Sequence, residues 1–496
     1  MRATKLRTLA ERAFKWSALT TIGRFALQLV AQVVLARLLG PSNYGVYGIG
    51  LVVLTFAGFL AGNAFSYSLV LKKEVDDDDV RFAFTWQLMA GLVCAAGVYA
   101  SAGWLATYFG DPRVEPMLRW ISVAVLLQSL IAPSSCLMTR ELNFRDIGLI
   151  HLGSYGAGYL MVGVPLALRG FEAQALAGAC VVQALVALVA SFALRPHPIK
   201  PLLRHPMSAD TFDTGRTVFF TNMVNWLLTN VDRIVIGRLL NTHSVGLYNV
   251  AYNFASIPYV LLVNSLQPTF LAAGARLQDD LRQLGQAWLT LLACMMVFLI
   301  PAGVLLSMLA GDLVRVLYGP AWSEAGWVMA IMFLCLPAWC CLGMSTPVLW
   351  NTGRKHLEAM LQLPMLAAAV PLWWLLAPLG IRAIVIAAAG VIFARAIVIV
   401  AAGLRALDLS WRLLLPFALR GLALAAVCGV AVTLGRQFVS SLHQPLATLI
   451  VEGCTGFGTL LLVTLVWPQV LGPEARGVLS RLIPSMGPRW APQARP

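Results

Sequence analysis

The chain is 496 residues long, with 59% hydrophobic and only 12% charged residues and a mean hydropathy of +0.78. Soluble domains carry roughly 25% charged residues, so this composition excludes a soluble fold and indicates an integral membrane protein. The formal net charge of +14 does not indicate nucleic-acid binding, because the basic residues are spread over many small loops instead of one face.

The first 16 residues are strongly basic. They contain Arg2, Lys5, Arg7, Arg12 and Lys15, and no cleavage-site pattern follows the apolar run after them. We therefore expect residues 1–16 to form a cytoplasmic amphipathic N-terminus and not a signal peptide.

Hydrophobic segments of about 20 residues, the length that crosses a bilayer, recur along the whole chain. They predict about fourteen transmembrane helices, near residues 17–39, 44–70, 82–109, 117–138, 147–168, 171–194, 215–240, 246–272, 284–310, 323–350, 358–379, 381–404, 415–435 and 445–469. With the N-terminus inside, most of the 36 Lys and Arg residues fall on the cytoplasmic side. This bias predicts a multi-pass protein with both termini in the cytoplasm.

A polar stripe in the first predicted span returns 201 residues later. At this offset Thr20, Thr21, Arg24, Gln28 and Gln32 align with Thr221, Asn222, Asn225, Thr229 and Arg233. The alignment continues to Gly45 and Tyr47, which match Gly246 and Tyr248. At about 100° per residue, the first set shares one side of a helix. Polar groups along one face of a membrane span are expensive there and normally line an interior cavity.

A duplicated half with a polar inner face is the layout of a transporter. We therefore expect an all-α integral membrane protein with two six-helix bundles, related as parallel repeats around a central cavity. The expected parts are the cytoplasmic N-terminus 1–16, the N-terminal bundle 17–194, a cytoplasmic linker 195–214, the C-terminal bundle 215–404, an additional helix pair 405–469 and a cytoplasmic tail 470–496.

Arg24 gives the main indication of the substrate. It lies about eight residues into its span, so roughly 12 Å from the cytoplasmic end at 1.5 Å per residue. A guanidinium at that depth needs an anionic partner, and its planar fork suits phosphate oxygens. The alternatives are a neighbouring carboxylate, or a side chain that extends to the cytoplasmic surface. The predicted substrate-binding residues of the cavity are Arg24, Gln28, Gln32, Asn222, Asn225, Thr229, Asp232 and Arg233.

Other charged residues within predicted spans leave several roles open. Asp232 could neutralise an arginine across the cavity, bind a coupling cation or hold two helices together; the structural role is favoured. Arg395 and Glu452 could satisfy each other as structural charges or belong to a proton path. His151 is more typical of a core histidine than of a proton carrier.

The sequence contains no catalytic or metal-binding pattern. Phosphate loops, nucleophile elbows and paired metal ligands do not occur at the required spacing, and the nine cysteines all fall in hydrophobic runs, as packing residues do. We therefore expect no enzyme activity, no metal and no cofactor. Uphill transport would have to be driven by a proton or sodium gradient, by a partner or by consumption of the product.

The segments 230–240 (NVDRIVIGRLL) and 245–252 (VGLYNVAY) resemble the mid-chain signature of polysaccharide transporters. This family of O-antigen and exopolysaccharide flippases belongs to the multidrug/oligosaccharidyl-lipid/polysaccharide (MOP) exporter superfamily. Residues 35–47 (LARLLGPSNYGVY) resemble its first-span signature, and 317–322 (LYGPAW) resemble its outer loop before the tenth span.

The resemblance implies a flippase for undecaprenyl-pyrophosphate-linked oligosaccharide repeat units in the bacterial inner membrane, acting by alternating access for exopolysaccharide, capsule or lipopolysaccharide O-antigen synthesis. Polyprenyl-pyrophosphate-linked oligosaccharide and the lipid bilayer are the implied partners, with a polysaccharide polymerase and export machinery as further candidates. The alternatives are a lipid II flippase or a multidrug exporter of the same superfamily. A membrane-embedded sugar polymerase or glycosyltransferase is the alternative from another class, although the outer loops are short for it.

Overall fold

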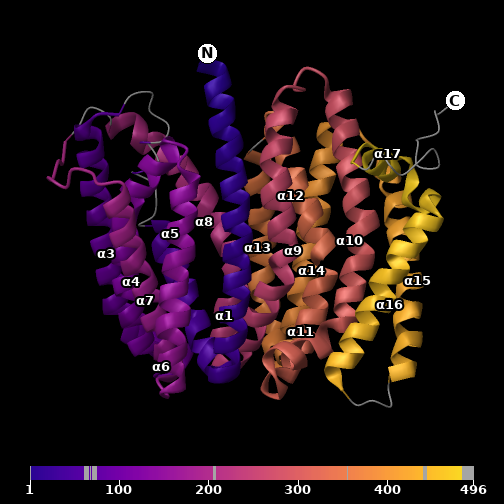
Figure 1. Cartoon of the computed structure of the whole chain (residues 1–496), viewed down its shortest axis with the longest axis horizontal. Coiled ribbons are helices and arrows are strands. Elements are labelled where there is room, and N and C mark those ends of the chain that lie inside the picture. The colour runs from indigo at the N-terminus through magenta and orange to yellow at the C-terminus, as the bar shows by residue number, and fades with distance from the viewer. Residues whose placement is uncertain are drawn as a thin grey trace. The chain divides into compact units, whose positions relative to one another are not determined.

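The structure, a computed structural model of the 496-residue chain, describes the backbone of residues 2–60, 66, 69, 75–204, 208–354, 356–439 and 444–482. Side chains are described for the same residues except 2–15, 17, 18, 208–222, 225, 438, 439, 481 and 482. The described residues form helices and turns with no strand among them, so the predicted all-α class is confirmed (Figure 1).

The chain divides into two compact units, Met1–Gly246 and Leu247–Pro496. The helices that lie in the first unit are α1 (Arg2–Leu60), α3 (Asp77–Phe109), α4 (Val114–Arg140), α5 (Phe144–Tyr155), the π-helix η1 (Gly156–Gly163), α6 (Val164–Leu168), α7 (Glu172–Leu194) and α8 (Ser208–Leu239). Helix α9 (Thr242–Ala275) begins in this unit and continues into the second. The second unit also contains α10 (Leu281–Tyr318), α11 (Ser323–Leu334), α12 (Leu336–Asn351), α13 (His356–Leu376), α14 (Ile381–Ala406), α15 (Leu415–Val439), α16 (Pro445–Val466) and α17 (Gly472–Leu482).

Eleven helices of the described chain are long and apolar enough to cross a membrane. The segment 320–334 and α12 pass the same test together across a bend of 42°, which makes up to twelve. The prediction of a multi-pass helical membrane protein is therefore confirmed. Helix α8, predicted as the seventh span, is not among the eleven, and its residues 208–222 and 225 lie outside the described side chains.

Helix α1 is two helical legs joined at Gly40. This glycine has φ 71° and ψ 173°, a conformation that only glycine adopts without strain, and Pro41 follows it as the first residue of the next leg. Because an unbroken helix of this length would far exceed the thickness of a bilayer, the break explains how one continuous stretch serves both predicted segments 17–39 and 44–70.

Helix α3 begins at a capping box formed by the acidic run that precedes it. The Asp76 carboxylate accepts a hydrogen bond from the backbone N–H of Asp79 at 2.7 Å, and the Asp79 carboxylate accepts one from that of Asp76 at 3.1 Å. Asp79 is buried. Asp76 and Asp79 therefore fix the start of the helix.

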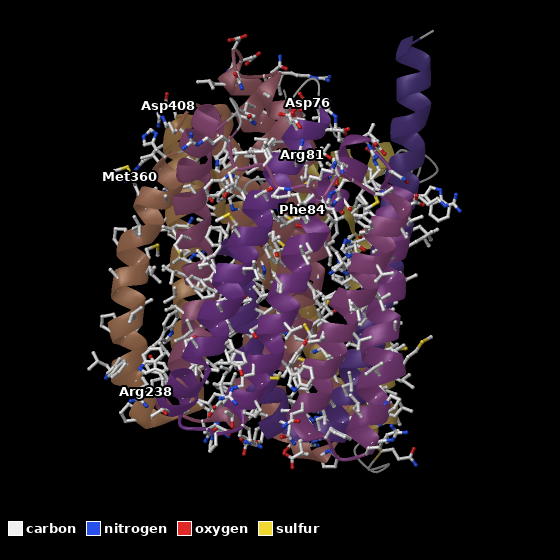
Figure 2. All side chains as sticks on the ribbon, turned by 90° about the vertical axis from the view of Figure 1, so that its left-hand side faces the viewer. Asp76, Arg81, Phe84, Arg238, Met360 and Asp408 are labelled. Atoms are coloured by element: carbon white, nitrogen blue, oxygen red, sulfur yellow. The ribbon has the colours of Figure 1, made fainter. Side chains whose placement is uncertain are left out.

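The predicted linker begins as an extended segment that lies along α3. Arg81 Nε donates to the backbone oxygen of Lys200 at 3.2 Å, and the backbone N–H of Leu202 donates to Thr85 Oγ1 at 2.9 Å. Figure 2 shows Arg81 near one end of the helices of this unit and Arg238 near the opposite end. The linker and the end of α8 therefore mark opposite ends of the first unit.

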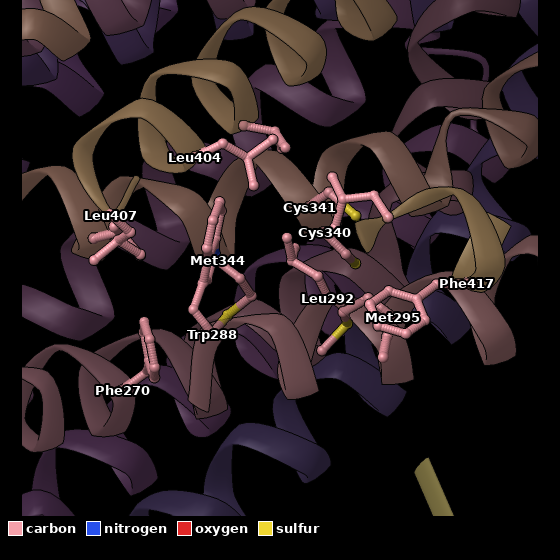
Figure 3. Close-up of a cluster of buried hydrophobic side chains, with 14 of the residues drawn as sticks. Phe270, Trp288, Leu292, Met295, Cys340, Cys341, Met344, Leu404, Leu407 and Phe417 are labelled. Atoms are coloured by element: carbon pink, nitrogen blue, oxygen red, sulfur yellow. The ribbon is translucent and has the colours of Figure 1, made fainter. Parts of the chain in front are cut away.

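The second unit is built around an apolar cluster of α10, α12 and α14 (Figure 3). Trp288 and Leu292 of α10 pack with Met344 of α12 and Leu404 of α14, and each is 1% exposed or less. Within a membrane such helices associate through close packing, since lipid tails are as apolar as the core itself. Six of the nine cysteines are buried, as packing residues should be, but Cys454 is exposed on α16.

Candidate functional site

Arg24 lies on the first leg of α1, which packs against α5 in parallel. Thr20 contacts Gly148, and Cβ atoms built on Gly23 and Gly156 would lie 3.6 Å from Leu152 and 3.8 Å from Leu27. This register places Arg24 beside the residues of α5 that lie between these contacts.

Arg24 has two neighbours on α5 that the sequence did not assign to the site. Both His151 and Tyr155 lie within electrostatic range of its guanidinium. The Tyr155 ring stacks on Tyr159 at 4.4 Å between centroids, which fixes its orientation. No carboxylate among the described side chains forms an ion pair with Arg24, so the alternative of a neighbouring acidic partner finds no support in this part of the chain.

Gln28 and Gln32 follow Arg24 on the same leg, one and two turns further along. Both side chains, like Arg24, are partly exposed within the first unit. Arg24, Gln28 and Gln32 of the predicted stripe are therefore accessible, whereas Thr20 is buried against α5.

Helix α8 carries the second half of the predicted stripe. The Asp232 carboxylate accepts a hydrogen bond from the backbone N–H of Arg233 at 2.8 Å, and Arg233 NH1 donates to Asn230 Oδ1 at 3.3 Å. Asp232 is buried, Arg233 partly exposed and Thr229 exposed. The predicted contributions of Asn222 and Asn225 lie outside the described side chains.

Helix α8 packs against the second leg of α1. Trp226 Nε1 donates to Thr55 Oγ1 at 3.2 Å, and the Trp226 ring lies 4.8 Å from that of Phe56. The predicted residues on α1 and α8 thus belong to one compact unit, but the described contacts do not join Arg24 to Arg233.

Arg395 and Glu452 do not pair with each other. Gln362 Oε1 accepts hydrogen bonds from Arg395 Nε at 3.0 Å and NH2 at 2.7 Å, whereas Arg436 Nε lies 2.8 Å from Glu452 Oε1. The interpretation as mutually satisfied charges was therefore wrong. Arg395 and Glu452 each pair with a residue of a neighbouring helix, Gln362 and Arg436 respectively. Sequence spacing alone does not predict such partners.

A polar network at the α3–α4 turn was missed by the sequence analysis. Asp111 pairs with Arg113 at 2.7 Å and accepts from Thr242 Oγ1 at 2.9 Å. Arg113 NH2 also donates to Ser42 Oγ at 2.7 Å. Burial alone would raise the pKa of Asp111, but the hydrogen bonds from Arg113 and Thr242 outweigh it and hold the pKa below the usual value. The network joins the turn to the second leg of α1 and the start of α9.

A separate small cavity of about 200 Å³ lies at the linker end of the first unit. Charged side chains of both signs line it, among them Asp76, Arg140, Glu141 and Arg195, together with His197. Arg195 NH2 and Glu141 Oε1 already form an ion pair at 2.8 Å. Among the described residues, no group of three or more His, Cys, Asp or Glu side chains is arranged to hold a metal ion.

The fold is that of a multi-pass membrane transporter. It is similar to the lipid II flippase MurJ in an inward closed conformation, with a TM-score of 0.69 and 14% identity over 94% of this chain and 99% of that one. It is also similar to an inward-facing multidrug resistance MATE family transporter of the MOP superfamily, with a TM-score of 0.62 and 12% identity over 78% of this chain and 94% of that one. At these identities the likeness defines the fold and no more.

The chain belongs to the family of polysaccharide biosynthesis proteins, whose family model matches residues 34–326. It is 27% identical over 363 residues to the succinoglycan biosynthesis transport protein ExoT of Rhizobium meliloti (strain 1021), covering 73% of this chain and 70% of that protein. It is 25% identical over 324 residues to the lipopolysaccharide biosynthesis protein WzxC of Escherichia coli (strain K12), covering 65% of each. The resemblance predicted from the sequence is thereby confirmed.

Proposed function

We propose that the protein is a flippase that moves undecaprenyl-pyrophosphate-linked oligosaccharide repeat units from the cytoplasmic to the periplasmic leaflet of a bacterial inner membrane. The transport and biosynthesis roles in the names of its relatives support this class of function. The observation that carries the proposal is Arg24, an arginine well inside a membrane span that no described carboxylate neutralises. Its product would feed the assembly of exopolysaccharide, capsule or O-antigen.

The proposal includes about fourteen crossings with both termini in the cytoplasm. Counting α1 as two legs, α8 as one crossing and the bent pair as one raises the eleven helices to that number. Each leg of α1 between Leu19 and Leu60 is close to the 20 residues that span a bilayer. The bundles 17–194 and 215–404, the linker 195–214 and the helix pair 405–469 remain the proposed parts of this layout.

The mechanism follows from the cost of moving a diphosphate through hydrocarbon. An isolated anion there costs many kcal/mol, so the headgroup needs a polar route that replaces its hydration. Arg24 would attract the pyrophosphate from the cytoplasmic side and Arg233 would receive it further along, while Gln28, Gln32 and the polar residues of α8 meet the sugars. The lipid tail would stay in the bilayer while the cavity opens first to one side and then to the other.

A lipid II flippase is the second candidate, because the fold is similar to MurJ over nearly the whole chain. Both substrates present a polyprenyl diphosphate, so Arg24 serves either one. A multidrug exporter would offer carboxylates to cationic substrates, which the first span lacks. We expect no catalytic role, no cofactor and no metal, with a proton or sodium gradient as the candidate drive.

The test is deletion of the gene followed by identification of the lipid-linked oligosaccharide that accumulates on the cytoplasmic leaflet. Accumulation of a surface-polymer repeat unit is expected, and rescue should fail with Arg24→Ala. Arg119→Ala is the matched control, because it removes an exposed arginine of α4 that is already paired with Glu115. Loss of peptidoglycan synthesis would identify lipid II as the substrate, and normal polymer output from inserted Arg24→Ala would contradict the role of Arg24.

A further inference from the structure

Three ionisable side chains meet inside the second unit, where α15 and α16 pack on α10. Arg436 of α15 lies between Asp312 of α10 and Glu452 of α16: its NH2 is 3.0 Å from Asp312 Oδ2 and its Nε is 2.8 Å from Glu452 Oε1. Glu452 is 1% exposed and lies seven residues after the start of α16, roughly 10 Å into the helix at 1.5 Å per residue. A buried charge at this depth of a span is a candidate functional group.

The packing around Glu452 is tight and apolar. A Cβ on Gly456 would lie 2.6 Å from Leu305 and 2.8 Å from Val432, so α16 approaches α10 and α15 as closely as a glycine allows. Leu305, Val432 and Cys428 form a buried apolar cluster. Glu452 therefore lies next to apolar side chains, and Arg436 is the cation that can balance its charge.

The charges of the cluster do not balance when all three groups are ionised, because two carboxylates face one guanidinium. Arg315 lies 3.9 Å from Asp312, but its side chain is 62% exposed, and an ion pair of that kind is weak. The 3-10 helix Pro468–Leu471, which also packs against α16, carries no titratable residue, and Glu474 of α17 lies 3.9 Å from Arg420. One excess negative charge therefore remains in a low-dielectric environment, where it is costly.

The two carboxylates differ in how Arg436 meets them. Its NH2 donates a directed hydrogen bond to Asp312 Oδ2 at 3.0 Å. Within the described part of the chain, neither oxygen of Glu452 accepts a directed side-chain hydrogen bond, although Arg436 Nε is close. Asp312 is thus the better stabilised carboxylate, and Glu452 is the one on which a proton removes the excess charge.

We infer that Glu452 is a proton-binding site, at which one bound proton leaves Arg436 paired with Asp312 alone. Arg436 lies in the last turn of α15 with its side chain 57% exposed, so protons reach the cluster from that end of the helix pair. Protonation removes the ion pair between α15 and α16 while the pair between α15 and α10 persists. The site does not depend on the identity of the transported substrate.

The test uses a hydrophobic carbodiimide on the purified full-length protein, followed by peptide mass spectrometry. The protonated carboxyl adds across a C=N bond of the reagent, its proton passes to nitrogen, and rearrangement leaves a stable N-acylurea. We expect Glu452 to be labelled, more strongly as the pH falls, and the label to be lost in Glu452→Gln. Glu324→Gln, which removes an exposed carboxylate at the start of α11, should leave the label unchanged.

Two further variants separate proton binding from a purely structural ion pair. Asp312→Asn should reduce the labelling several-fold, because one arginine then balances one carboxylate, whereas Arg436→Gln should increase it. Melting temperature and elution volume establish that each variant is folded. Absence of label on folded wild-type protein would overturn the inference, and so would labelling that is the same in both variants as in the wild type. Neither result would contradict the proposed transport function.

Discussion

Gly45 and Gly246 lie against each other at the point where the second leg of α1 meets the start of α9. A Cβ on Gly45 would lie 2.9 Å from the backbone nitrogen of Gly246, and one on Gly246 would lie 3.1 Å from that of Gly45. The contact is reciprocal, since a Cβ on Gly45 would also meet the carbonyl of Thr242 and one on Gly246 that of Pro41. Pro41 and Thr242 match at the same 201-residue offset as Gly45 and Gly246. Glycine at both positions lets the two backbones approach this closely, because neither residue has a Cβ.

The first prediction concerns this crossing. Gly45→Ala places a methyl group against the backbone of α9, and no side-chain movement can relieve this clash. We therefore expect the free energy of unfolding to fall by about 1–3 kcal/mol through overpacking. Gly97→Ala is the matched control, because nothing lies within 4 Å of a Cβ there. Thermal melting should show a lower midpoint for Gly45→Ala and an unchanged or higher one for Gly97→Ala. Equal midpoints would argue against the close contact.

The second prediction concerns the network at Asp111. Its pKa lies below the usual 3.8, so the carboxylate contributes stability that is complete above pH 3.8 and is lost as the pH falls toward the lowered value. Asp111→Asn should therefore be less stable than the wild type near neutral pH. The difference should shrink in acid, as measured by thermal melting across a pH series. A difference that stays constant below pH 3.8 would show that the charge of Asp111 is not responsible.

The third prediction concerns His197 in the linker segment. Its ring lies 5.2 Å from that of Phe84 and 5.4 Å from that of Phe192, and burial, aided by the nearby charge of Arg195, lowers its pKa below 6.5. A histidine in the unfolded chain takes up a proton near pH 6.5, but the buried His197 ring does not. The packing of this ring against Phe84 and Phe192 therefore becomes less stable as the pH falls below 6.5. Hydrogen-exchange protection of residues 195–204, taken relative to the intrinsic amide exchange rate at each pH, should decrease in acid. His197→Phe should remove that decrease, and an unchanged acid response in this variant would point to other groups.

The fourth prediction concerns the neighbours of Arg24. If His151 and Tyr155 assist it in holding a diphosphate, Tyr155→Phe and His151→Leu should each weaken substrate binding by roughly 3- to 10-fold, the usual effect of one lost hydrogen bond of about 1 kcal/mol. Binding can be measured with purified protein and a lipid-linked oligosaccharide. Leu149→Ala, at an exposed position of the same helix, serves as the control. Full affinity in both site variants would remove these residues from the site.

The all-helical, multi-pass architecture could be predicted from the sequence, because the length of an apolar span is a local pattern. The close approach of Gly45 and Gly246 was not predicted, because aligned positions in a repeat need not touch. The partners of Arg395 and Glu452 could not be predicted in this way. Their neighbours Gln362 and Arg436 lie on other helices, and nothing in sequence spacing fixes how those helices pack.

The candidate site was predicted in part for the same reason. Arg24, Gln28 and Gln32 follow from helical periodicity along one leg of α1. His151 and Tyr155 come from α5, and the packing of α1 on α5, at contacts such as Thr20 with Gly148, brings them beside Arg24. The sequence analysis interpreted His151 as a core histidine. In the structure His151 also lies near the Arg24 guanidinium.

The most direct test of the account is the rate at which the purified protein, in proteoliposomes, moves a lipid-linked oligosaccharide diphosphate between leaflets. Arg24→Ala should lower the initial rate roughly 10- to 100-fold, as expected for loss of a charge-assisted interaction of about 1.5–3 kcal/mol. Arg24→Lys should recover part of it, because the charge returns without the planar fork. A wild-type rate in Arg24→Ala, with Arg119→Ala behaving identically, would contradict a diphosphate route past Arg24.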